Sequence, residues 1–170
     1  HWTLLHDQTS IQGQGTQKYE HNTEQGYYRV LMLVTNRVGN GHGNDYLNFE
    51  EWEIYGNEAY SRSPLLSDNY LISNAVEPVL SDVNIFVDQS NAKRAHLLFN
   101  RIYAGGSDAG SFYVTAYDSG GQATSSFISG YDGVAIQVDF GSLFYIQSSV
   151  IYPRPNWYHS APAHFRIYGA

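Results

Sequence analysis

Apolar and polar residues alternate with a period of two along much of the chain. In residues 134–140, apolar side chains stand at every second position without interruption. This pattern predicts a strand with one buried face and one solvent-facing side. Residues 28–35 are instead apolar almost throughout, which favours a central strand that is covered on both faces.

The same criterion predicts further strands, and segments rich in Gly, Pro, Asn or Ser predict the connections between them. The other predicted strands are residues 1–5, 47–55, 84–87, 96–103, 112–117, 144–152 and 165–168. The predicted turns and loops are residues 8–17, 39–45, 141–142 and 153–162. The apolar phase slips between Phe49 and Trp52, which predicts a bulge near Glu50 and Glu51. No amphipathic helix longer than about three turns is found, so the sequence predicts an all-β protein.

A five-residue phrase occurs twice, as WEIYG at 52–56 and as FRIYG at 165–169. In both copies, large apolar residues alternate with a charged residue, and a Gly closes the phrase. Alternation predicts that the charged residues, Glu53 and Arg166, face water. The residues predicted to be buried are Trp52, Ile54, Phe165 and Ile167.

Composition adds limits to this picture. A chain of 170 residues is long enough for one sizeable core. Its 15 Tyr and 16 Gly suit many strands and tight turns. Residues 58–90 differ in composition from the rest of the chain, with Pro64, Pro78 and scattered Ser, Asn and Asp. We interpret them as a linker that carries one strand, and such a long connection predicts a role of its own.

Charge and cysteine content exclude several classes of function. A net charge of −7 argues against nucleic-acid binding and against docking on anionic membranes. No apolar run approaches the roughly 20 residues of a membrane span. The absence of Cys excludes disulfides and Cys-ligated zinc. The chain starts at His1 and shows no signal peptide, which suggests a processed or excised segment.

Two stretches resemble the discoidin family, the galactose-binding-like module also known as the coagulation-factor type C domain. The first comprises residues 134–141, 146–154 and 162–169, and it is similar to the family's "wiqvdlG", "v.iypR" and "sPk.f.i.G" strands. The second comprises residues 2–5, 27–31 and 47–56, and it is similar to the family's "W..l", "yyRl" and "l.EiE.yG" segments. The resemblance implies a jelly-roll β-sandwich.

The two stretches stand in the opposite order to that of the family. Residues 1–57 resemble the second half of the sandwich, residues 58–90 form the linker, and residues 91–170 resemble the first half. Three arrangements remain open: a circularly permuted domain, one register of a tandem array, or half-sandwiches exchanged between neighbouring molecules in a head-to-tail polymer. The strands that complete the sandwich carry Trp2, Leu4, Trp52, Ile54, Phe165 and Ile167.

Residues 153–162 form the best candidate for a binding loop. Aromatic faces stack on the C–H surfaces of sugars, and Arg supplies a forked hydrogen-bond donor. The candidate glycan-binding residues are therefore Arg154, Trp157, Tyr158 and His159. The competing interpretation is that these aromatic rings pack beneath their own loop or at a subunit contact.

Other polar groups invite a functional interpretation but favour a structural one. His42, Asn44 and Asp45 lie in a Gly-rich segment that suits calcium ligands or, more simply, a solvated turn. Single carboxylates beside turn residues are expected to be turn caps; they are Asp7, Asp118 and Asp132. A cluster of carboxylates invites comparison with a glycosidase pair, but an outward strand face predicts solubilising charges; they are Glu50, Glu51 and Glu53. We therefore predict no catalytic residue, no metal and no cofactor.

These observations favour a non-enzymatic extracellular or cell-surface module. The first interpretation is a repeating subunit of a self-assembling fibre or filament, in which the partner is a second copy joined head to tail. The alternative is a glycan-binding, lectin-like adhesion module.

Overall fold

The computed structural model describes residues 1–9, 17–20, 26–39, 46–58, 84–87, 94–99, 103, 111–124, 126–128 and 131–170. Within these residues the protein is all-β, with antiparallel strands and two short 3-10 helices. The predicted all-β class is confirmed at this level. Most of the 58–90 linker lies outside the described residues, as do His42, Asn44 and Asp45.

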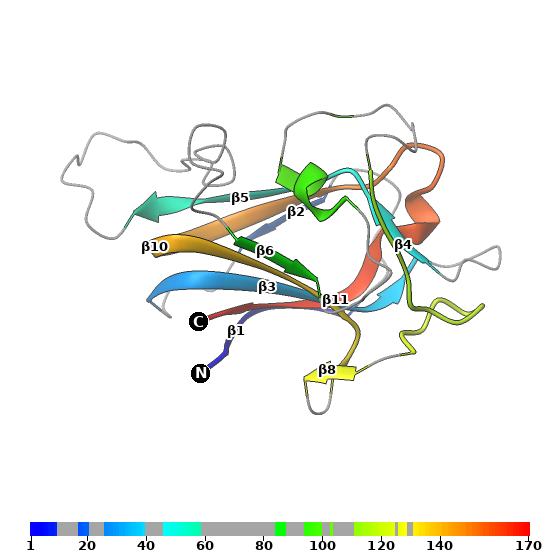
Figure 1. Ribbon diagram of the computed structural model, residues 1–170, viewed down its shortest axis with the longest axis horizontal. Helices are drawn as coiled ribbons and strands as arrows, with labels where there is room; N and C mark the ends of the chain where they lie inside the picture. Colours follow the sequence, from blue (N-terminus) through cyan, green and yellow to red (C-terminus); the bar gives the residue numbers. More distant parts are fainter. Residues whose placement is uncertain are drawn as a thin grey trace.

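One large sheet is built around a long strand, β10 (Val134–Tyr152), of 19 residues. On one side of β10 the order is β3 (Tyr27–Val38), then β11 (Pro162–Gly169), then β1 (Thr3–Gln8) at the end of the sheet. Three shorter strands also pair with β10. They are β2 (Gln17–Glu20), β5 (Glu51–Glu58) and β6 (Asn84–Val87). Figure 1 shows β10, β3, β11 and β1 side by side.

Two small sheets and two helical turns complete the described structure. Strand β4 (Tyr46–Phe49) pairs with β7 (Phe112–Thr115), and β8 (Ser126–Ile128) pairs with β9 (Tyr131–Asp132). The 3-10 helices are η3 (Ala95–Phe99) and η5 (Tyr158–Ser160).

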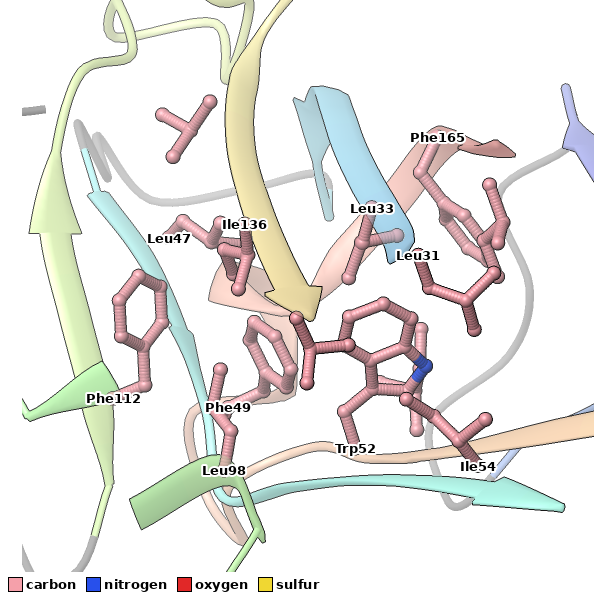
Figure 2. Packing of buried hydrophobic residues seen from close by; sticks show 14 of the residues in the cluster. Leu31, Leu33, Leu47, Phe49, Trp52, Ile54, Leu98, Phe112, Ile136 and Phe165 are labelled. Atoms are coloured by element: carbon pink, nitrogen blue, oxygen red, sulfur yellow. The ribbon is translucent and has the colours of Figure 1, made fainter. Parts of the chain in front are cut away.

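The hydrophobic core lies between the large sheet and the β4–β7 pair. Figure 2 shows Leu31 and Leu33 of β3 and Ile136 of β10 directed toward side chains of β4, β5, β7 and η3. The predicted buried residues of both phrase copies belong to this core; Trp52, Ile54, Phe165 and Ile167 are all 0% exposed. Removing such large apolar side chains from water is the main favourable term in folding. The prediction made from period-two alternation is therefore confirmed at these four positions.

The opposite face of β3 is buried as well. Met32 and Val34 are 0% exposed and form a second cluster with Ala135 and Tyr168. Trp2, just before β1, packs against this cluster, as does a residue of β9. Since β3 lies between β11 and β10 and is covered on both faces, the prediction of a central strand is confirmed.

The first and last strands pair with each other. Thr3 lies opposite Gly169, so the two ends of the chain are neighbours (Figure 1). Ala170 continues the pairing on the other side of β11 by exchanging backbone hydrogen bonds with Val30 of β3. The two stretches identified in the sequence thus contribute to one sheet within one chain.

Three predicted elements are wrong in detail. Residues 95–99 form η3 rather than part of a strand over 96–103. The strand predicted over 47–55 is interrupted at Glu50, where the predicted bulge is a bend, and its parts β4 and β5 join different sheets. Residues 141–142 do not turn the chain back, because β10 continues through them. Gly141 instead has a φ of 76°, and the pairing with β3 shifts register between Asp139 and Phe144, as in a bulge.

The short strand predicted at residues 84–87 is confirmed as β6, which pairs with β10. The sequence did not predict β2, β8 or β9. These strands have two to four residues each, too few to show a period.

Candidate functional site

The loop predicted to bind ligands is a compact double turn. The N–H of Trp157 donates to the carbonyl of Arg154 (3.0 Å), and the N–H of Ser160 donates to the carbonyl of Trp157 (2.9 Å). Asn156 adopts a φ of 67°, a left-handed conformation that Asn tolerates better than most residues. The two turns display Trp157, Tyr158 and His159 on consecutive positions.

The backbone of this loop packs closely on the end of β3. The N–H of Gly39 donates to the carbonyl of Ala161 (3.1 Å). A Cβ at position 39 would lie 2.9 Å from the backbone of His159, so only Gly allows this approach. The loop is therefore fixed to the sheet.

The aromatic residues of the loop meet two tyrosines from the small β4–β7 sheet. We call Tyr46, Tyr113, Trp157, Tyr158 and His159 the aromatic surface. The ring centroids are 5.5 Å apart for Tyr113 and Tyr46, and 5.9 Å apart for Tyr46 and Trp157. His159 lies 5.6 Å from both Trp157 and Tyr158. These rings form one continuous series of contacts.

The members of the aromatic surface differ in exposure. Trp157 is 36% exposed and Tyr158 is 40% exposed, whereas Tyr46, Tyr113 and His159 are half-buried. Each exposed ring thus presents part of its surface to solvent while resting on a neighbouring ring. The sequence left two interpretations open, a binding loop and rings packed beneath the loop. The exposed faces of Trp157 and Tyr158 fit the first, and the contacts among the rings fit the second.

Arg154, the remaining predicted binding residue, lies beneath the loop. Arg154 is 6% exposed, and its Cζ lies 5.3 Å from the centre of the Trp157 ring. A guanidinium over an indole face is a favourable cation–π contact. Arg154 therefore supports Trp157 from inside, and its burial leaves Trp157 and Tyr158 as the more accessible groups.

The pairing between β1 and β11 forms a second candidate site, which we call the terminal seam. Asp7 of β1 lies directly opposite Arg166 of β11. The Nε of Arg166 donates to Oδ2 of Asp7 at 3.0 Å. The guanidinium also lies over the ring of Tyr131 on β9, 4.2 Å from its centre. Both side chains of the ion pair are 31% exposed.

Electrostatics at the terminal seam favour the charged form of Arg166. Partial burial acts to lower the pKa of its guanidinium, but hydrogen bonds with Tyr168 and Asp7, and their charges, raise the pKa overall. Burial, followed by the negative charge of Asp7, raises the pKa of Tyr131. Tyr131 therefore stays neutral and offers its π-face to the cation. The expectation that Asp7 is a turn cap is wrong, because Asp7 lies within a strand.

The strand residues named for assembly occupy different environments along this seam. Trp2 packs on the outer cluster, while Leu4 is 39% exposed. The register shifts between Leu4 and His6, and Leu5, at this irregularity, enters the core with 5% exposure. Phe165 on β11 contacts His6 and Tyr19 through their rings, at 5.9 and 4.9 Å.

The carboxylates predicted to face outward, Glu50 in the bend before β5 and Glu51 and Glu53 in β5, are buried, which corrects the sequence prediction. Glu50 is 2%, Glu51 0% and Glu53 4% exposed. Tyrosine hydroxyls donate to the Glu53 carboxylate, from Tyr55 at 2.7 Å, Tyr103 at 2.5 Å and Tyr152 at 3.1 Å. A buried charge requires such hydrogen bonds, and three donors supply them here.

The tyrosines around Glu53 also contact one another. The rings of Tyr103 and Tyr152 lie 4.8 Å apart. Burial first, and then the hydrogen bond to Glu53, raises the pKa of Tyr103. Both tyrosines therefore remain neutral donors. The arrangement anchors position 103 to β5 and β10.

A second, partly exposed ion pair joins β3 and β10, which are neighbouring strands in the middle of the large sheet. Arg29 of β3 donates to Asp139 of β10 through both Nε and Nη2, at 2.7 and 2.9 Å. The N–H of Gly141 also donates to Asp139 at 2.9 Å. The hydrogen bond from Arg29 lowers the pKa of Asp139, burial opposes this, and the Gly141 N–H adds to the lowering. This pair stabilises the irregular part of β10.

Of the other predicted turn caps, Asp118 is confirmed. Its Oδ1 accepts from the N–H groups of Gly120 and Gln122, at 2.8 and 2.9 Å. Asp132 lies in β9 rather than in a cap at the end of a turn. Among the described residues, no three His, Asp or Glu side chains are grouped as a metal site would require.

Comparison with known proteins adds no relative. Neither the protein-family models, nor the curated proteins, nor the solved structures gave a match to this chain. Within the part of the chain that the structure describes, no helix is long and apolar enough to span a membrane.

Proposed function

We propose that the protein is a non-enzymatic glycan-binding module that uses its aromatic surface. The observation that carries this proposal is the continuous contact of aromatic rings from Tyr113 to Tyr158, with Trp157 and Tyr158 the most exposed. Partly exposed rings that are held by their neighbours lose little side-chain freedom when a ligand binds. Sugar C–H groups then stack on a pre-oriented surface.

The rest of the molecule supports a module whose role is to hold this surface. The loop is fixed by backbone hydrogen bonds and by the close approach of Gly39 to His159. The Glu53 carboxylate is already occupied by tyrosine donors. We therefore place the binding function on the loop and assign the buried carboxylates to stability.

The proposal extends to the type of β fold and to the cellular location. We infer a jelly-roll β-sandwich of the galactose-binding-like, discoidin type, acting outside the cell or on its surface. The support is that β11 and β1 pair as neighbours, which joins the two resembling stretches in the family's order. The core between the large sheet and the β4–β7 pair suits two facing layers.

The test of glycan binding compares Trp157→Ala with a matched exposed tyrosine. Trp157→Ala should abolish retention on a glycan array and leave the melting temperature nearly unchanged, because the ring is partly in solvent. The control is Tyr27→Ala. Tyr27 is 53% exposed and packs on Tyr145, on a different part of the protein, and the variant should keep full retention.

Two outcomes would contradict the proposal. The first is that the parent protein is not retained by any glycan on the array. The second is that Trp157→Ala lowers the melting temperature strongly, in which case Trp157 is a packing residue.

A second function is favoured by the terminal seam. The protein is then a repeating subunit of an extracellular fibre, in which β1 of one copy pairs with β11 of the next, head to tail. The specific observation is that β1 stands at the end of the strand order of the large sheet. A strand at the edge of a sheet is a template for pairing with another chain, and a heterologous contact that does not close produces an open filament.

Assembly is tested by light scattering and electron microscopy over a range of concentrations. The expected result is a concentration-dependent series of oligomers or filaments. A single species of 19.1 kDa at every concentration would exclude strand exchange and leave the closed, circularly permuted monomer.

A further inference from the structure

We propose that Asn48 is the polar contact of the aromatic surface, and that its side-chain amide forms a hydrogen bond with a hydroxyl group of a neutral sugar. This inference rests on the first proposed function, glycan binding. It adds the residue that distinguishes one sugar from another and the chemical class of the ligand.

Asn48 lies on the face of β4 that carries the aromatic surface. Side chains alternate along a strand, and Leu47 and Phe49 are 0% exposed in the core (Figure 2). Asn48 therefore shares the opposite face with Tyr46, and it lies directly across the β4–β7 pair from Tyr113. Side chains that stand opposite each other in an antiparallel pair are neighbours. Asn48 is thus placed beside two rings of the aromatic surface.

The side-chain oxygen of Asn48 is buried and lacks a donor. Asn48 is 3% exposed, and none of the described residues donates a hydrogen bond to its Oδ1. The loop covers this face of the strand, because η5 packs against β4. A buried amide oxygen without a donor costs free energy, so folded proteins keep few of them. The oxygen is an acceptor for a ligand that contacts the neighbouring rings.

The chemistry of the amide indicates a hydroxyl group as its partner. An amide presents an acceptor oxygen and a donor nitrogen, and a hydroxyl group both donates and accepts. An ionised carboxylate or sulfate only accepts, so it cannot donate to Oδ1. The net charge of −7 also opposes the approach of an anionic glycan. The ligand is therefore a neutral sugar that stacks its C–H face on Trp157 and directs one hydroxyl group toward Asn48.

A ring must turn aside before the hydroxyl group reaches Asn48. Tyr46 and Tyr113 are half-buried, and neither belongs to the hydrophobic core. Aromatic side chains outside the core change rotamer without disturbing its packing. The new hydrogen bond then replaces part of the ring contact, and it removes the cost of the unpaired oxygen.

The test is the variant Asn48→Leu, which keeps a similar side-chain volume and has no hydrogen-bonding group. The array carries neutral oligosaccharides of glucose, galactose and mannose, together with acidic ones that bear sialic acid or sulfate. Affinity for the best-retained neutral sugar, measured by tryptophan fluorescence titration, should fall about tenfold or more. The melting temperature should stay unchanged or rise, because the variant removes an unpaired buried oxygen. A residue with only a structural role would give the opposite result, a loss of stability.

Analogues of the same sugar locate the hydroxyl group. Each analogue has one hydroxyl group replaced by hydrogen. One of them should bind the parent protein about tenfold more weakly than the intact sugar does. Against Asn48→Leu, this analogue and the intact sugar should bind equally well, because both comparisons remove the same hydrogen bond.

Ser148 provides a matched control. It is 0% exposed, and its Oγ likewise has no hydrogen bond from or to any described residue. Ser148 lies on β10, opposite Tyr55 of β5, in the large sheet rather than in the β4–β7 pair. Ser148→Ala therefore removes an unpaired buried oxygen elsewhere and should keep the affinity of the parent.

The outcomes separate this inference from the function beneath it. A parent protein that no glycan retains overturns glycan binding and the inference together. Several results overturn the role of Asn48 alone: retention by acidic glycans only, full affinity in Asn48→Leu, a joint loss of stability and affinity in that variant, or equal binding of every deoxygenated analogue to the parent. In those cases the glycan-binding proposal stands on Trp157 and its own test.

Discussion

The two copies of the repeated phrase have the same apolar positions and opposite surroundings at the charged one. In β5, Glu53 is 4% exposed and accepts hydrogen bonds from three tyrosines. In β11, the side chain of Arg166 is 31% exposed and pairs with Asp7. Alternation therefore predicts which residues share a face of a strand. It does not predict what covers the other face.

The difference has a physical cause in the surroundings of each strand. Over β5, Tyr103 and Tyr152 bring hydroxyls to the polar side, so a buried carboxylate is satisfied without a cation. Over β11, the polar side borders Tyr131 and the edge strand β1. One charged position is part of the buried structure, and the other is held in a partly exposed ion pair.

The largest expected effect tests what the two copies share. Trp52→Ala and Phe165→Ala each remove a ring that is 0% exposed, and each should lower the free energy of unfolding by about 3–5 kcal/mol. Urea denaturation followed by tryptophan fluorescence and circular dichroism measures both. A loss below about 1 kcal/mol for Phe165→Ala alone would show that the terminal seam packs less firmly than β5.

The next effect tests where the copies differ. Glu53→Ala leaves three tyrosine hydroxyls without their acceptor and should cost about 1–3 kcal/mol of unfolding free energy. Arg166→Ala removes a partly exposed ion pair and should cost less than about 1 kcal/mol. Glu53→Gln, which keeps an acceptor oxygen, is the matched control and should be intermediate. Equal losses for Glu53→Ala and Arg166→Ala would remove the distinction between the two sites.

The sequence predicted the shared features because they are local. Trp52, Ile54, Phe165 and Ile167 follow from side-chain direction within a single strand. The burial of Glu53 depends on hydroxyls that come 50 and 99 residues later in the chain, and Asp7 meets Arg166 across 159 residues. No pattern within one segment carries information about those partners.

The same limit applies to the aromatic surface. Trp157, Tyr158 and His159 were predicted because three rings follow one another in a loop. Tyr46 and Tyr113 were missed, since they join the surface only through the β4–β7 pairing, in which Asn48 lies opposite Tyr113. The burial of Arg154 was missed because its exposure is set by the fold of the loop around it.

The smallest expected effect separates the two charged positions by their response to salt. The ion pair of Arg166 and Asp7 is partly exposed to solvent, so salt screens it. In 1 M NaCl the Debye length is only about 3 Å. The few tenths of a kcal/mol that distinguish the parent from Arg166→Ala should therefore shrink toward zero between 0.05 and 1 M NaCl. Glu53 is held by neutral hydroxyl donors in a buried site, so the loss caused by Glu53→Ala should persist at high salt. Urea midpoints at the two salt concentrations provide the measurement. A salt-sensitive loss at Glu53 would mean that solvent ions reach its carboxylate, and the contrast between the two copies would then be one of degree.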